Sequence, residues 1–148
     1  MNSSRILHED NHLIAVNKSS SEIVQGDRTG DASMPDEIKA YLKEKYNKPG
    51  NVFCGVIHRL DRPTSGVILF ARTSKGLERM NKQFRDKLTT KIYWAILENK
   101  PPQEKGTLVH YLKKNEKQNK SYVSNKDVKG SKEAILKYHI LSSSDRYH

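Results

Sequence analysis

The chain is most tightly constrained at its centre, where two short apolar runs flank a segment that cannot continue a strand. Residues 51–57 read NVFCGVI and residues 67–71 read VILFA, and runs of this kind are typical of buried strands. Between them, Pro63 and Gly66 favour a turn. The sequence therefore predicts two strands joined by a rigid turn that presents polar side chains from residues 58–66.

The rest of the chain predicts more strands than helices. A helix is expected to start at Ser33, because Asp36 follows three residues later in a capping-box pattern, and to stop before Pro49. A second helix is expected after Thr73, and the run 113–120 is expected to be a basic loop or hairpin tip. Further strands are expected at 5–9, 12–17, 91–98, 106–112 and 133–141.

These elements predict an α+β fold with a mixed, mainly antiparallel sheet and flanking helices, because strands and helices do not alternate regularly. At 148 residues, the chain has the size of one domain. No apolar run is long enough for a membrane span, and the N-terminus lacks a signal-peptide pattern, so we expect no membrane partner and a cytoplasmic location. Cys54 is the single cysteine and is expected to be a buried, inert thiol.

The formal net charge of +10 favours a polyanionic partner, with nucleic acid as the leading class. A protein that is merely kept soluble by lysine is the alternative. Residues 8–12, HEDNH, match a zinc-protease pattern, but that pattern binds zinc only when both histidines lie on one helix. Asp10 and Asn11 instead predict the turn of a hairpin, so no metal site is expected.

Asp61 is the one acidic residue in the central turn, and it lies between Arg59 and Arg62. Nearby cations favour the ionised form of a carboxylate. Three roles are open at this point: a structural ion-pair partner, an organiser of phosphate-binding arginines, or a catalytic carboxylate. The structural role is the leading one from the residues alone, because most neighbouring Asp-Arg pairs are surface ion pairs. Because a carboxylate repels a polyanion, its place in a basic protein also raises the option of chemistry at a sugar or base.

The motif GVIHRLDRPTSGVILFART resembles the central motif of the RluA-type RNA pseudouridine synthases. Four further stretches agree with this family in order and spacing: ILHEDNHLIAVNK, MNKQFRDK, KIYWA and KGSKEAILKYHIL. The resemblance extends over essentially the whole chain. It implies the catalytic-domain fold of that family, and an enzyme that isomerises a specific uridine in ribosomal or transfer RNA to pseudouridine without a metal or organic cofactor.

The resemblance also assigns roles to individual residues. Asp61 matches the catalytic aspartate, which can act on the ribose anomeric carbon or on the base. Arg59 matches the arginine that enters the RNA helix where the target nucleotide is flipped out, and Arg62 is expected to contact phosphate. Tyr93 matches the tyrosine that packs against the flipped uracil. His58 is expected to orient the loop beside the RNA.

The chain departs from the family pattern at two places. Relatives read Asn-Lys-Pro-x-Gly near the start, whereas this chain has Ser19 and Ser21 at the proline and glycine positions. The family also continues into a motif of the Gly-Arg-x-His-Gln-Ile-Arg kind, whose arginine pairs with the aspartate. The resemblance therefore predicts that residues 1–148 are the N-terminal portion of a single catalytic domain, with no separate S4-like domain.

A noncatalytic or inactive RNA-binding fragment of such an enzyme is the alternative function, and a monomer is the favoured state. Exposed cations are expected to attract the RNA backbone whichever function holds. These are Arg85, Lys87, Lys113, Lys114, Lys117 and Lys120.

Overall fold

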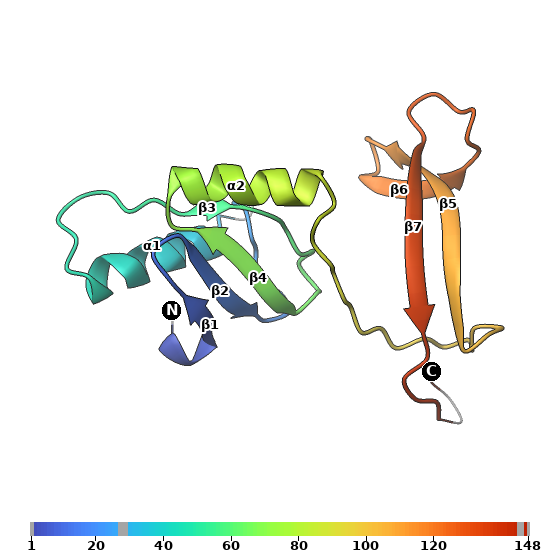
Figure 1. Cartoon of the computed structure of the whole chain (residues 1–148), viewed down its shortest axis with the longest axis horizontal. Helices are drawn as coiled ribbons and strands as arrows, with labels where there is room; N and C mark the ends of the chain where they lie inside the picture. Colours follow the sequence, from blue (N-terminus) through green and yellow to red (C-terminus); the bar gives the residue numbers. More distant parts are fainter. Residues whose placement is uncertain (1, 27–29, 145–146, 148) are drawn as a thin grey trace. The chain divides into compact units, whose positions relative to one another are not determined.

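The computed structural model describes residues 2–26, 30–144 and 147, and it divides into two compact units after Lys91 (Figure 1). The loop predicted between Asn17 and Ser33 includes residues 27–29, which lie outside the described residues. None of the helices in the described ranges is long and apolar enough to cross a membrane.

The first unit is a four-stranded antiparallel sheet with two helices. Its strand order is β1-β2-β4-β3, and β1 and β2 form the predicted opening hairpin. The elements are η1 (Ser3–Arg5, a short 3-10 helix), β1 (Ile6–Glu9), β2 (Leu13–Lys18), α1 (Met34–Lys45), β3 (Gly55–Val56), β4 (Gly66–Ala71) and α2 (Ser74–Arg85).

The core of this unit lies between α1 and one face of the two central strands. Alternate residues of β2 and β4 point to this face, and Ile14, Val16, Ile68 and Phe70 are fully buried there. Helix α1 contributes residues at helical spacing, including Ile38. The central pair β2 and β4 is therefore fixed by hydrogen bonds along its length and by packing against α1.

Both helices begin where the sequence predicts. Ser33 is the N-cap of α1, although its hydroxyl donates to the Asp36 carboxylate at 2.6 Å instead of accepting a backbone N–H. At the start of α2, the Thr73 hydroxyl accepts the N–H of Gly76 at 3.0 Å. A Cβ at Gly76 would lie 2.9 Å from the carbonyl oxygen of His12, so only glycine lets α2 approach the β1–β2 hairpin this closely.

The second unit contains a three-stranded antiparallel sheet in the order β6-β5-β7. Its strands are β5 (Lys105–Asn115), β6 (Lys120–Ser124) and β7 (Lys132–His139). Strands β5 and β6 form a hairpin whose tip lies within the basic run 113–120, as predicted. The sheet carries exposed apolar side chains on both faces, among them Val109 on one and Leu136 on the other.

The fold class is α+β with antiparallel sheets, as predicted, but the described strands form two sheets instead of one. The strand predicted at 91–98 is wrong: the structure has neither helix nor strand from residue 91 to 97. Ile92, Trp94 and Ile96 are at least 80% exposed. A strand needs a partner for its backbone groups, and this segment finds none among the described residues.

Candidate active site

The central turn connects β3 to β4, and its shape comes from backbone geometry. The N–H of Thr64 donates to the carbonyl of Asp61 at 3.0 Å, which closes a tight turn around Arg62 and Pro63. The chain then enters β4 through Gly66, whose φ of 129° is a conformation that residues with a side chain rarely adopt. The predicted turn is therefore confirmed, and its glycine is a geometric requirement.

Asp61 is exposed at this turn. Its carboxylate forms no hydrogen bond or ion pair within the described residues. The side chains of the neighbouring arginines contact Gln25 and Asp31 instead. The Arg59 guanidinium donates to the side-chain oxygen of Gln25 at 3.3 Å. This geometry argues against the structural ion-pair role and leaves the carboxylate accessible for chemistry or for a ligand.

The Arg62 side chain connects the turn to the loop after β2. Its guanidinium donates to the carbonyl of Ser21 at 3.0 Å and pairs with Asp31 at 3.0 Å. In return, the N–H of Ser21 donates to the carbonyl of Arg62 at 2.8 Å. Arg62 therefore holds two loops together in this structure, whereas its predicted contact with phosphate stays a prediction.

His58 lies at the start of the turn, between β4 and α2. Its Nε2 accepts the N–H of Leu69 at 3.1 Å, and its ring stacks on Phe84 with 5.0 Å between ring centroids. Burial lowers the pKa of the imidazole, and the charge of Lys91 lowers it further. A neutral ring with the proton on Nδ1 matches these contacts. His58 thus anchors the turn to β4 and α2, while its role beside the RNA stays a prediction.

The sequence analysis missed Lys18, which lies beneath the turn at the end of β2. Its side chain is buried, and its ammonium donates to the carbonyls of Asp61, Arg62 and Thr64. Two signals were available: the alternation of β2, which places Lys18 on the same inward face as Ile14 and Val16, and the lysine of the Asn-Lys-Pro-x-Gly pattern.

Tyr93 lies in the second unit, is 59% exposed and belongs to no strand. Arg85 and Lys87 lie at the exposed C-terminal end of α2, and Lys87 has a φ of 56°. Lys113, with the other predicted hairpin lysines, is exposed on the β5–β6 hairpin. The RNA roles of these residues stay predictions.

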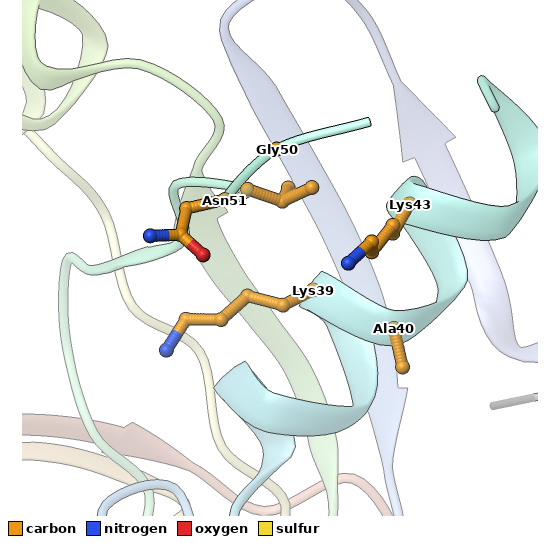
Figure 2. A pocket seen from close by; sticks show the side chains of 6 residues that line it. Lys39, Ala40, Lys43, Gly50 and Asn51 are labelled. Carbon is orange, nitrogen blue, oxygen red and sulfur yellow. The ribbon is translucent and has the colours of Figure 1, made fainter. Parts of the chain in front are cut away.

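A hollow of about 400 Å³ lies between α1 and residues 50–52. Figure 2 shows the side chains that line it. It is lined by residues that include Lys39, Lys43 and Asn51, and by none of residues 58–66. Cys54 is half-buried, and burial raises the pKa of its thiol to about 12, which makes it a poor nucleophile.

The HEDNH segment does not lie on a helix. His8 lies on β1 and pairs with Asp10, while His12 is hydrogen-bonded to Thr73. Asp10 also accepts the N–H groups of His12 and Leu13, both at 2.7 Å, which forms the predicted hairpin turn. The described residues include no group of three or more potential ligands that could hold a metal ion.

Comparison with known proteins decides the family. Residues 12–148 match the model of the RNA pseudouridylate synthase family. The chain belongs to this family, within its RluA-type branch. It is 35% identical over 138 residues to ribosomal large subunit pseudouridine synthase C of Rickettsia prowazekii, covering 93% of this chain and 43% of that protein.

A second relative supports the assignment of family, and a solved structure supports the fold. Ribosomal large subunit pseudouridine synthase D of Borreliella burgdorferi is 30% identical, covering 96% of this chain and 44% of that protein. The solved structure of human RNA pseudouridylate synthase domain containing 4 has a TM-score of 0.81 at 22% identity, covering 98% of this chain and 56% of that one. The chain therefore spans less than half the length of the two ribosomal large subunit pseudouridine synthases and 56% of the human chain.

Hydrogen bonds and an ion pair hold the loop in which this chain has serines at the family's proline and glycine positions. Ser21, at the glycine position, has a φ of 73°, so it keeps the left-handed conformation without a glycine. The N–H of Ser19, at the proline position, donates to Glu22 at 2.6 Å. Glu22 is also paired with Arg5. A carboxylate and an arginine therefore fix the loop where relatives use a proline.

Because Ser21 is strained, Ser21→Gly is expected to raise the free energy of unfolding by about 0.5 kcal/mol. Relief of the left-handed strain, about 1 kcal/mol, exceeds the added unfolded-state entropy of glycine, about 0.5 kcal/mol. Ser20→Gly is the matched control. Because Ser20 does not have a positive φ, this substitution relieves no strain and should lower the free energy of unfolding. Urea unfolding followed by circular dichroism measures both, and a loss of stability in Ser21→Gly would contradict the expectation.

Proposed function

We propose that this chain carries the catalytic aspartate of an RNA pseudouridine synthase, with Asp61 acting on a uridine that has been flipped out of the RNA. The observation that carries the proposal is the Asp61 carboxylate itself, exposed on a rigid turn and unpaired within the described residues. Its position in the family motif adds support, because a carboxylate at this place needs a chemical reason in a chain with a net charge of +10.

The reaction is an isomerisation, so it needs no external oxidant or reductant. The bond between uracil N1 and the ribose anomeric carbon breaks, and a bond forms between that carbon and uracil C5. The hydrogen of C5 leaves to solvent, and N1 takes up a proton. Asp61 assists the detachment of the base, either as a nucleophile or as a base.

Arg59 is proposed to enter the RNA helix at the flipped nucleotide. Its side chain is exposed and held only by the 3.3 Å contact with Gln25 among the described residues, so it can reorient toward RNA. Base flipping costs a few kcal/mol, and a planar cation that stacks and binds phosphate offsets part of that cost. Tyr93 is proposed to stack on the flipped uracil.

Large-subunit ribosomal RNA is the proposed substrate, because two of the most similar relatives are named for that activity. Transfer RNA is the alternative substrate. The cytoplasmic location and the monomeric state expected from the sequence also stay proposals.

A tritium-release assay tests the proposal. The 148-residue chain is incubated with unmodified ribosomal or transfer RNA labelled at uracil C5, and release is expected with ribosomal RNA. Asp61→Asn should lower release by at least about a hundredfold while it leaves RNA affinity unchanged, since it removes only the reacting group. Asp86→Asn changes another exposed aspartate in the same way and should keep full release.

Equal release from the chain and from Asp61→Asn would remove Asp61 from the chemistry. If neither protein releases tritium but both bind RNA, the noncatalytic RNA-binding function is correct for this chain.

A further inference from the structure

Lys18 is buried where a charge is costly. It is the last residue of β2, and its side chain is only 1% exposed. An ammonium that leaves water loses several kcal/mol of solvation unless hydrogen bonds and opposite charges replace it. An apolar side chain at this inward position would need no such compensation, so packing alone does not explain the lysine.

The ammonium of Lys18 is surrounded by backbone carbonyls. Its Nζ lies 3.1 Å from the carbonyl oxygen of Asp61, 3.0 Å from that of Arg62 and 2.6 Å from that of Thr64. The carbonyl of Ser19 completes the shell at 3.2 Å. An ammonium has three N–H donors, so these acceptors satisfy all of them. Three of the four acceptors belong to the central turn, more than 40 residues away in sequence.

Two carboxylates lie near enough to influence this charge. Burial lowers the pKa of Lys18, while the negative charges of Glu22 and Asp61 act in the opposite direction. Glu22 is itself fixed by Arg5 and by the N–H of Ser19. The cation therefore has its charge partly balanced from the turn above it and from the loop beside it.

We propose that Lys18 is a positioning residue for Asp61: its buried ammonium gathers the carbonyls of Asp61, Arg62 and Thr64 and so holds the aspartate in its reactive place. Because the carbonyl of Asp61 is bound inward, its carboxylate remains exposed on the outer side of the turn. This proposal rests on the proposed function for its catalytic consequence. Its structural consequence, a turn fixed by the ammonium, holds for the chain whether or not it is active.

The first test measures amide hydrogen exchange in the 148-residue chain. Lys18→Met keeps the apolar stem and removes the ammonium. The amides of Thr64 and Ser21, which are bonded to turn carbonyls, should exchange about tenfold faster, which corresponds to the loss of about one hydrogen bond. Amides of α1 should keep their rates. Lys43→Met, at an exposed lysine of α1, is the matched control and should change neither set.

The second test separates binding from turnover. Because Lys18 is buried and cannot touch RNA, Lys18→Met should keep the RNA dissociation constant of the unsubstituted chain. Single-turnover tritium release should fall about a hundredfold, the effect expected when a reacting group is displaced by about 1 Å.

A chemical rescue gives the third test. Lys18→Cys is made together with Cys54→Ala, and the thiol is alkylated with 2-bromoethylamine in denaturant before refolding. This product restores an ammonium at the length of lysine. It should recover slow exchange at Thr64 and, in an active chain, the rate of release, whereas alkylation with iodoethane should recover neither.

The proposal is overturned if Lys18→Met speeds exchange equally in the turn and in α1, or if it does not fold, since Lys18 would then be a general core residue. Unchanged exchange at Thr64 overturns it as well. If the unsubstituted chain releases no tritium, the proposed function fails for this chain, and the exchange and rescue results still decide the role of Lys18. Full release by an active Lys18→Met protein removes the catalytic consequence and refutes the positioning role.

Discussion

The affinity of this chain for RNA is expected to fall about a thousandfold between 50 and 200 mM salt, as it does for proteins that make about six phosphate contacts. The physical reason is counterion release, because each cation that neutralises a phosphate frees a bound ion. The net charge of +10 gives the chain a positive electrostatic field that attracts the RNA backbone. The proposed contacts are the exposed side chains of Arg85, Lys87, Lys113, Lys114, Lys117 and Lys120.

Fluorescence anisotropy with labelled RNA over a salt series measures the slope of log affinity against log salt. Replacing Lys113, Lys117 and Lys120 by Gln should reduce that slope by two to three units, about 0.7–0.9 for each lost contact. Lys114 is left unchanged because it pairs with Glu116 at 3.0 Å.

A matched control removes the same charge from exposed lysines of the first unit. Lys43, Lys48 and Lys75 are replaced by Gln, and the slope should stay close to that of the unsubstituted chain. Equal reductions in the two triple variants would show that only net charge matters. A flat salt response of the unsubstituted chain would contradict the phosphate-contact prediction altogether.

The elements that the sequence predicts correctly are those with local signals. The β1–β2 hairpin follows from the turn preference of Asp10. Its carboxylate accepts the backbone N–H groups of His12 and Leu13. The two helices follow from Ser33 and Thr73 at their N-caps and from apolar spacing. The turn at Asp61 follows from Pro63 and a glycine with positive φ.

The strand predicted at 91–98 failed because a strand depends on a partner that its own sequence does not specify. Its apolar, β-branched pattern fits a strand, yet Ile92 and Trp94 remain exposed and their backbone is unpaired among the described residues. A similar limit applied at residues 51–57, where only Gly55–Val56 pair with β4. Local preference sets which segments can be strands, and long-range pairing decides which of them form.

Lys18 and Glu22 were not predicted as part of the site for a related reason. Their importance comes from contacts with residues distant in sequence, such as Thr64 for Lys18 and Arg5 for Glu22. The local signs for Lys18 were its inward position on a buried strand and its match to the lysine of the family's Asn-Lys-Pro-x-Gly pattern. The family pattern drew attention instead to the replaced proline and glycine. In this chain the N–H of Ser19 donates to Glu22 and the N–H of Ser21 donates to the carbonyl of Arg62.

Glu9, the acidic residue of the HEDNH segment, is the centre of a polar cluster that ties α1 to the sheet. Its carboxylate accepts hydrogen bonds from Tyr46 at 2.6 Å, Lys45 at 2.9 Å and Tyr41 at 3.2 Å, and pairs with Arg72 at 3.1 Å. The side chains of Glu9 and Arg72 are 8% and 10% exposed. Burial alone would raise the pKa of Glu9, but its hydrogen bonds and the nearby cations leave that pKa below its usual value.

We therefore expect Glu9→Gln to lower the free energy of unfolding by about 3 kcal/mol, because it leaves the Arg72 cation buried without its counter-charge. The stability that Glu9 contributes is present above the unfolded pKa of a glutamate. It is lost as the pH falls through the lower folded pKa. The variant should accordingly show a smaller loss of stability below about pH 4.5 than the unsubstituted chain.

Urea unfolding followed by circular dichroism at 222 nm reports on this cluster selectively, because α1 and α2 both lie in the first unit. Asp86→Asn is the matched control: it breaks the exposed ion pair between Asp86 and Lys82, and it should cost less than about 0.5 kcal/mol. If Glu9→Gln costs no more than this control, the buried pair does not hold α1 in place. Glu9→Gln could also lower the free energy of unfolding strongly while losing as much stability below pH 4.5 as the unsubstituted chain does. That result would assign the effect to packing around Tyr46 instead of to charge.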